Sequence, residues 1–287
     1  MFNKFVDKTK AFLYRSLNRG QLRKLQIFRD WFNTYVFTLK KEKLSPLGFK
    51  LVVGSYAANR QMQDGNYETE ETNIIKKLLA EADVFVDVGA NIGIYTCLAR
   101  SLGKPSLAVE PQPRNLKFLY ANLIINGWSD TEVYPLGLSK DYGLMPLYGA
   151  SGPSASLVQG WAGYSKRFKQ VIPLMTMDGL LGNRFMGKKL LIKIDVEGAE
   201  YEVMCGAQKT MDLVPRPTWF VEICLGEYLP NGINPNFEKI FDLFWKRNYK
   251  ALLADSKLTP VIPGDINRWI KSGHTDTGII NYIFIPE

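Results

Sequence analysis

The strongest constraint on the fold is an alternation of short strand-like runs with helical stretches, which continues from residue 84 to the end of the chain. This alternation is typical of a mostly parallel β-sheet with helices on both faces. Seven runs are predicted to be strands, at residues 84–88, 106–109, 132–136, 190–194, 219–223, 250–253 and 279–285. No clear helical pattern separates the last two, so the seventh strand could run antiparallel to its neighbours.

Helices are predicted between the strands, one beginning near Ile92 and others at residues 114–126, after Glu197 and at residues 236–247. In sheets of this class, ligands bind beyond the carboxyl ends of the strands. We therefore expect the functional residues in the segments that follow the strands, namely 87–93, Glu110, 137–141, 195–197, Glu222 and 255–278.

The positive charge of the chain is confined to its amino-terminal end. The chain has 36 Lys and Arg against 28 Asp and Glu, a net charge of +8. Residues 1–50 hold twelve of the basic and three of the acidic residues, which leaves 24 against 25 in the other 237 residues. A basic arm on a neutral body indicates a surface for phosphates or anionic lipid rather than a fold enclosed by nucleic acid.

Apolar residues within positions 2–39 recur at helical intervals in two blocks separated by Gly20, and basic residues lie opposite the first block. The pattern predicts a basic amphipathic helical extension over residues 1–50, followed by the main domain over residues 51–287. The pattern agrees with two alternatives: these helices pack on the main domain, or they bind to an anionic membrane surface.

Composition excludes several classes of protein. With 46% hydrophobic and 22% charged residues, the chain is globular rather than disordered. Its three cysteines have no short spacing, so the sequence indicates neither a disulfide framework nor a zinc site. The single histidine, His274, excludes sites that need two. No secretory signal or membrane-spanning run is found, so the expected location is the cytoplasm, peripheral at the membrane if the arm binds there.

The segment from Asp87 to Gly93 closes the first strand and opens a helix. Its glycines allow a tight turn and close approach of the backbone to a ligand, and the helix amino terminus favours an anionic group. The next strand ends in Glu110, 21 positions after Gly89. A carboxylate at that place can accept hydrogen bonds from ribose hydroxyls, so the pair indicates a nucleoside ligand.

The sequence also indicates which nucleoside-containing cofactor fits, because it excludes the nicotinamide cofactors. A nicotinamide cofactor requires the spacing G-x-G-x-x-G, but the second and third glycine positions hold Asn91 and Ile94. The loop therefore lacks the close approach that a pyrophosphate needs. S-adenosylmethionine has no phosphate, and its charged groups suit a helix amino terminus and nearby acidic side chains.

Two other segments carry charged residues that need an explanation. Residues 182–189 fit the first seven positions of a P-loop, but they lack the final Ser or Thr and precede a strand, so we predict an exposed turn.

Strand alternation places Lys193 and Asp195 on one face of the fourth strand. A lysine inside a central strand is costly unless it is paired, so an acidic neighbour is expected.

Several segments together resemble the successive motifs of the FkbM family of S-adenosylmethionine-dependent methyltransferases. They are residues 87–96 (DVGANIGIYT), Glu110-Pro111, residues 176–181 (TMDGLL) and residues 193–200 (KIDVEGAE). Residues 65–72 (GNYETEET) also resemble the segment that precedes the first strand in that family. The similarity runs from residue 65 to residue 286, and Met177 stands where the family usually has leucine.

The resemblance implies the α/β Rossmann-like class I methyltransferase fold, a seven-stranded, mostly parallel sheet with an antiparallel seventh strand. It implies S-adenosylmethionine as the cofactor and methyl transfer to a hydroxyl of a sugar or a polyketide, free or lipid-linked. The candidate cofactor-binding residues are Tyr67, Glu68, Asp87, Gly89, Asn91, Gly93, Glu110, Ser139 and Asp195.

A sugar hydroxyl is a poor nucleophile, so a carboxylate or an imidazole is expected to accept its proton. Asp195 is the preferred candidate because it follows the fourth strand, with Glu222 and His274 as alternatives. No metal ion is expected, because the fourth strand lacks an Asp-Asp-Asn cluster, although Asp195 and Glu222 together could in principle hold a divalent ion. The aromatic residues of segment 143–165 either stack on a sugar or belong to a plain connection with a hairpin at residues 144–148.

Two other functions remain open from the sequence. The basic arm would suit an RNA methyltransferase, although the neutral body makes nucleic acid a disfavoured partner. The fold could also serve as a catalytically silent binding module. Binding of the cofactor separates the silent module from both enzymes.

Overall fold

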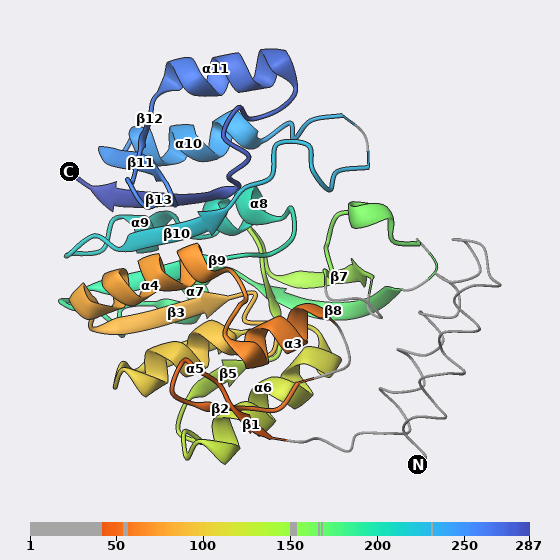
Figure 1. Cartoon of the computed structure of the whole chain (residues 1–287). Helices are drawn as coiled ribbons and strands as arrows, with labels where there is room; N and C mark the ends of the chain where they lie inside the picture. The colour runs from red at the N-terminus through yellow and green to blue at the C-terminus, as the bar shows by residue number, and fades with distance from the viewer. Residues whose placement is uncertain (1–41, 54–56, 150–153, 166, 168, 231) are drawn as a thin grey trace.

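The computed structural model describes residues 42–53, 57–149, 154–165, 167, 169–230 and 232–287 (Figure 1). The extension predicted over residues 1–50 therefore lies, up to residue 41, outside the described residues. Residues 43–51 form a short antiparallel hairpin of β1 (Lys43–Leu44) and β2 (Lys50–Leu51). Phe49 and Leu51 are buried in the core of the main domain, so this last part of the predicted extension packs with the domain.

A central β-sheet organises the domain, and all seven predicted strands belong to it. Its order is β12 (Pro260–Val261), β11 (Tyr249–Leu253), β13 (Asn281–Pro286), β10 (Thr218–Glu222), β9 (Leu190–Ile194), β3 (Val84–Val88), β4 (Ser106–Val109) and β5 (Glu132–Tyr134). The strands from β10 to β5 are parallel, and β13 runs antiparallel to both β10 and β11. The predicted antiparallel last strand is confirmed, and the two-residue strand β12 is an addition at the edge.

Helices cover both faces of this sheet, because each central strand is apolar on both faces. On one face, Phe85 and Leu191 pack with residues of α4 (Thr69–Glu81), α5 (Ile94–Ser101) and α6 (Pro113–Ile125). On the other face, Val86 and Ile192 pack with residues of the remaining helices. These are α7 (Met177–Leu181), α8 (Glu200–Cys205), α9 (Gln208–Met211), α10 (Phe237–Trp245) and α11 (Pro263–Ser272).

Helix α11 corrects the prediction that no clear helix joins the last two predicted strands. It begins after Ile262 with Pro263 at its first position, and the Asp265 side chain accepts a hydrogen bond from the Ile262 N–H. Ile266 and Trp269 bury one face of this short helix. Proline at the first helical position and aspartate two residues later are ordinary start signals, but only two buried side chains made the periodicity weak.

A second, three-stranded sheet lies between β5 and β9 in the chain. It has the order β6 (Gly137–Leu138), β8 (Lys169–Met175) and β7 (Gly143–Tyr148), with β7 antiparallel to β8. Only β7 was anticipated, as the hairpin at residues 144–148. This accessory sheet extends to one side of the central sheet, next to helix α3 (Ala57–Asp64) (Figure 1). The P-loop-like residues 182–189 form an exposed turn before β9, as predicted.

Candidate active site

A pocket of about 400 Å³ lies at the carboxyl ends of β3, β4, β9 and β10. Its wall includes seven of the predicted site residues: Tyr67, Glu68, Gly89, Asn91, Glu110, Asp195 and Glu222. The accessory sheet supplies apolar residues to the same wall, among them Leu147 and Ile172. Parallel strands that end at one edge bring these side chains together although they are far apart in the sequence.

The turn after β3 is fixed by close backbone packing. Gly89 has a φ of 83°, and a Cβ atom there would lie 1.7 Å from the backbone oxygen of Asp195. The Gly89 and Ala90 N–H groups both donate to the Val109 carbonyl, at 2.9 and 3.0 Å. Gly93 has a φ of 87°, and a Cβ atom there would lie 2.3 Å from Leu119. Glycine at 89 therefore permits the contact between β3 and β9 that forms the pocket floor.

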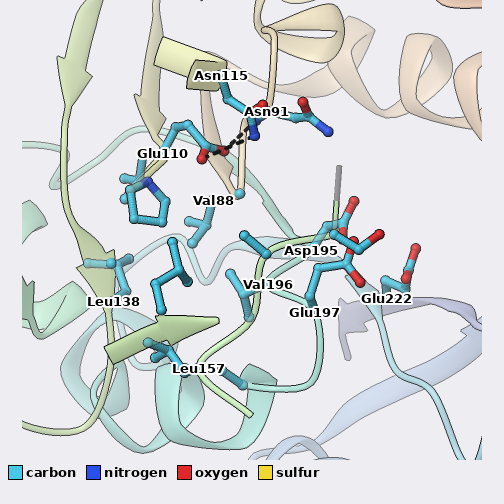
Figure 2. A pocket seen from close by; sticks show the side chains of 18 of the residues that line it. Val88, Asn91, Glu110, Asn115, Leu138, Leu157, Asp195, Val196, Glu197 and Glu222 are labelled. Carbon is cyan, nitrogen blue, oxygen red and sulfur yellow. Dashed lines mark hydrogen bonds between the residues drawn. The ribbon is translucent and has the colours of Figure 1, made fainter. Parts of the chain in front are cut away.

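Glu110 stands at the tip of β4 with 4% of its surface exposed. Figure 2 shows Glu110 beside Asn91 and Asn115. Glu110 Oε2 accepts from the Asn91 N–H at 2.7 Å, and its Oε1 accepts from the Gln112 N–H at 2.8 Å and from Asn115 Nδ2 at 3.3 Å. Burial raises the pKa of Glu110 to about 7, although these donors oppose the shift. A carboxylate has about four acceptor positions, so Glu110 can still accept from a ligand hydroxyl.

Lys193 confirms the expectation of an acidic neighbour. The side chain is 3% exposed, and its Nζ lies 2.9 Å from Asp195 Oδ2 and 5.0 Å from the centre of the Tyr95 ring. Burial alone would lower the pKa of Lys193, but the charges of Asp195, Asp87 and Glu68 raise it above its ordinary value. The ammonium group is therefore held in its charged form beneath the pocket.

Glu68 and Asp87 complete this network around Lys193. Glu68 Oε2 accepts from the Tyr95 hydroxyl at 2.6 Å, and burial raises the pKa of Glu68. Asp87 is 1% exposed and accepts from the Thr96 hydroxyl through Oδ2 at 2.5 Å. Asp87, a predicted cofactor-binding residue, does not line the pocket but lies behind the residues that do.

Three carboxyl groups meet at the opposite end of the pocket from Glu110. Figure 2 shows Asp195, Glu197 and Glu222 grouped together there. Burial and the Asp195 charge raise the pKa of Glu197 to about 8, and the same two causes raise the pKa of Glu222 well above its ordinary value. The Glu110 carboxyl group is therefore bonded to three donors, whereas the Asp195, Glu197 and Glu222 carboxyl groups repel one another.

Other predicted residues lie outside the pocket wall. Gly93 caps α5, and Ser139 is buried with its N–H on the Met175 carbonyl. His274 is exposed, with Nδ1 3.1 Å from the Ser272 carbonyl. The structure does not bring His274 to Asp195 and Glu222. The aromatic candidate Trp161 is 1% exposed and absent from the wall, so its ring is not available to stack on a sugar in this structure.

Sequence reasoning missed other residues of the wall. Glu197 falls within segment 195–197, where functional residues are expected, but the sequence assigns it no role, and it gives no indication of Tyr228 or Leu157. The position of Glu197, two residues after Asp195 at the end of a central strand, is the sequence feature that could have identified it as a pocket residue. Tyr228 and Leu157 belong to connections whose path the sequence pattern does not determine.

The wall fits S-adenosylmethionine. The Gly89 turn leaves no room for a side chain, and Glu110 offers a buried carboxylate to ribose hydroxyls. Acidic side chains elsewhere in the wall suit the positive charge of the cofactor.

Among the described residues, no group of three or more His, Cys, Asp or Glu side chains is arranged to hold a metal ion. None of the described helices combines the length and apolarity needed to cross a bilayer.

Comparison with known proteins agrees with this site. The methyltransferase FkbM domain matches residues 87–251, more than half of the chain. The chain is 31% identical over 149 residues to a hexuronic acid methyltransferase, AglP, of Haloferax volcanii. That match covers 50% of this chain and 59% of the relative, so it spans less than two thirds of the relative's length.

Solved structures show a looser likeness. A TehB-like methyltransferase of Corynebacterium glutamicum is 8% identical, with a TM-score of 0.42 over 79% of this chain and 93% of that chain. An O-methyltransferase of Bacillus cereus is 11% identical, with a TM-score of 0.40 over 89% of this chain and 94% of that chain. Likeness at this level does not bear on the reaction.

Proposed function

Because the chain belongs to the FkbM methyltransferase family, with S-adenosylmethionine as its cofactor, we propose that it methylates a hydroxyl group of a glycan or a glycosylated metabolite. The observation that carries the proposal is the pocket, which joins a buried carboxylate suited to ribose with a second end of carboxyl groups suited to a hydroxyl. The name of the Haloferax relative, a hexuronic acid methyltransferase, supports a sugar as the acceptor.

Residues at the Glu110 end and residues beside Asp195 would together bind and orient the cofactor. S-adenosylmethionine supplies a methyl group on a positively charged sulfur. Glu110 would accept hydrogen bonds from the ribose hydroxyls, with Gly89 and Asn91 in the wall beside it. Tyr67 and Glu68 line the wall beside Asp195, where negative charge suits the positive groups of the methionine part.

Asp195 is the proposed base for the acceptor hydroxyl. One of its oxygens is held by Lys193 Nζ at 2.9 Å, which orients the carboxylate, and its side chain lines the pocket. Its second oxygen would then accept the proton of the acceptor hydroxyl. Glu222 is the alternative base, since it lines the same end.

Radiolabelled methyl transfer tests the proposal. The protein is incubated with S-adenosylmethionine labelled in its methyl group and a panel of free, polyketide-linked and lipid-linked glycosides, with and without EDTA. We expect an alkali-stable methyl ether on a sugar and no effect of EDTA. A product labelled on RNA, or on no member of the panel although the cofactor binds, would contradict the proposed acceptor.

We further propose that the basic arm holds the protein at an anionic lipid surface near a lipid-linked acceptor. The support is the sequence pattern, twelve basic residues within positions 1–50. Basic residues at an anionic surface contribute about 1 kcal/mol each. In vesicle sedimentation at low salt, the full chain is expected to bind anionic vesicles and a chain beginning at Glu42 is not. Equal sedimentation of both would contradict this role.

A further inference from the structure

Trp161 connects the accessory segment to the acidic end of the pocket. It lies in the short 3₁₀ turn Trp161–Gly163, which belongs to the connection between β7 and β8. Its indole Nε1 donates to Glu197 Oε2 at 2.6 Å, and the side chain is 1% exposed. A buried indole N–H needs an acceptor, and here the acceptor is a carboxyl group of the pocket wall.

The backbone around Glu197 is shaped to receive this indole. Gly198 has a φ of 95°, and a Cβ atom there would lie 2.5 Å from the Trp161 ring. Glu197 itself has a φ of 56°, in the left-handed region that few residues other than glycine adopt. The Ser156 hydroxyl donates to the Glu197 carbonyl, which secures the same turn from the accessory side. Such strain persists only where surrounding contacts enforce it.

The loop after β10 supports Trp161 from the other side. The Tyr228 ring lies 5.8 Å from the Trp161 ring, and the Ala162 N–H donates to the Tyr228 carbonyl at 2.8 Å. Tyr228 also lines the pocket, as does Ser154. The indole, the Glu197 turn and the β10 loop therefore form one connected structure at this end of the pocket.

The charge of the wall is one-sided. The described wall contains six carboxyl side chains, namely Glu68, Glu71, Glu110, Asp195, Glu197 and Glu222, and no described wall residue is Lys, Arg or His. Lys193, whose charge opposes the raised pKa of Glu222, is 3% exposed and paired with Asp195. The described titratable groups that interact with Glu197 are Asp195, Glu200, Glu222, Cys224 and Tyr228, and none of them is basic.

From this geometry we infer that Glu197, positioned by the Trp161 indole, binds the acceptor and selects an uncharged hydroxyl-bearing ring over one that carries a carboxylate. The inference rests on the proposed function, because it takes this end of the pocket as the acceptor end. Trp161 is the positioning residue, since it acts through Glu197.

The selection follows from hydrogen-bonding capacity and charge. A hydroxyl both donates and accepts, so it can pair with a carboxyl group in either protonation state. A carboxylate on the acceptor ring can only accept hydrogen bonds. In this pocket it would lose its hydrating water, and no described residue of the wall offers a positive charge in return. The discrimination should increase as the pH rises and Glu197 ionises, because like charges then face each other.

The first test measures the contact between Trp161 and Glu197 without any acceptor. The indole ¹⁵N–¹H signals are followed against pH in the complex with S-adenosylhomocysteine, and Trp161→Phe identifies the signal. The Trp161 signal is expected to titrate near pH 8, the raised pKa of Glu197, and to lose that titration in Glu197→Gln. Trp269 is a built-in control, because its Nε1 donates to Asp276, whose pKa is lowered by that bond.

The second test measures selection with two matched probes, methyl α-D-glucopyranoside and methyl α-D-glucopyranosiduronate. Each is titrated into the same complex while the Trp161 signal is observed. The neutral glycoside is expected to bind about tenfold or more tightly than the anionic one at pH 8, and less selectively at pH 6. Glu197→Gln is expected to reduce the ratio.

The outcomes separate the inference from the proposed function. A Trp161 signal that does not titrate with Glu197, or equal or tighter binding of the anionic glycoside, would overturn the inference. A signal that responds to neither glycoside would also overturn the acceptor role of Glu197. In each of these cases methyl transfer to another acceptor could still be observed, whereas failure of the labelled transfer assay would contradict the proposed function.

Discussion

The two ends of the pocket are built by different kinds of structure. At the Glu110 end, the wall comes from the tips of β3 and β4, and each carboxyl oxygen accepts hydrogen bonds from groups at most 19 positions away. At the Glu197 end, the wall comes from β9, the β10 loop and the connection after β7, with Trp161 donating across 36 positions. The first end is built by two neighbouring strands and the turns that follow them, and the second depends on three distant segments.

This difference suggests a division of roles. A local, fully bonded end keeps one geometry and suits a cofactor that does not vary. An end assembled from loops can change its shape when a loop changes, which suits an acceptor that differs between enzymes. The following predictions distinguish the two ends, beginning with the largest expected effect.

Gly89→Ala should abolish measurable cofactor binding, because the new Cβ atom would lie 1.7 Å from the Asp195 oxygen at a φ of 83°. Overpacking and backbone strain together should lower the free energy of unfolding by about 3 kcal/mol or more. Gly127→Ala is the matched control, with a φ of 75° and nothing within 4 Å, and should cost only about 1 kcal/mol. Calorimetry and urea unfolding check both. Normal cofactor affinity in Gly89→Ala would contradict the close contact.

Asp195→Asn should lower the rate of methyl transfer by about 10²–10⁴-fold, because general-base catalysis contributes that much. Single-turnover transfer, with each variant first saturated with cofactor, is the measurement. His274→Ala is the control, since His274 is exposed outside the pocket, and it should keep the full rate. A slow Glu222→Gln beside a fully active Asp195→Asn would transfer the role to Glu222.

The pH dependence of stability should differ between the two ends. Burial raises the pKa of Glu110 to about 7 and that of Glu197 to about 8, from 4.5. Because the folded protein holds these protons more tightly than the unfolded chain, their stabilisation is complete below about pH 4.5. It is lost as the pH rises, through about 7 for Glu110 and about 8 for Glu197.

Urea unfolding of the cofactor-free protein between pH 5 and pH 9 measures this loss. In the wild type, the free energy of unfolding should fall as the pH rises. Glu110→Gln should remove about 1–3 kcal/mol of this fall, in the range below pH 7. Glu197→Gln should remove a similar amount, in a range that extends to pH 8. Glu132→Gln is the control, because hydrogen bonds from Tyr134 and Arg184 lower the pKa of Glu132. Identical pH profiles in all three variants and the wild type would refute the proton linkage.

The sequence predicts the Glu110 end better than the Glu197 end for the same physical reason. Strands β3, β4 and β9 were predicted to the residue, because buried parallel strands are continuous apolar runs bounded by turns. Gly89 and Glu110 follow directly from where those strands end. Lys193 also revealed its acidic neighbour, since an unpaired buried charge is too costly.

The accessory sheet and the Trp161 contact could not be predicted in the same way. β8 contains Pro173, and β7 has exposed residues at its first three positions, so neither has the pattern of a buried strand. Trp161 was recognised as an aromatic residue near the pocket, but its burial against Gly198 depends on packing between segments 36 positions apart. His274 illustrates the same limit, because its side chain is exposed and does not belong to the pocket wall.

Calorimetric titration of S-adenosylhomocysteine into the wild type and Glu110→Ala tests the claim that this pocket binds the cofactor through Glu110. We expect one site per wild-type chain and an affinity weaker by about 1–3 kcal/mol in the variant, because ribose hydroxyls lose their acceptor. Glu132→Ala, at an exposed carboxylate of β5, should bind normally. Unchanged affinity in Glu110→Ala, or tighter binding of NAD than of S-adenosylhomocysteine, would contradict the claim.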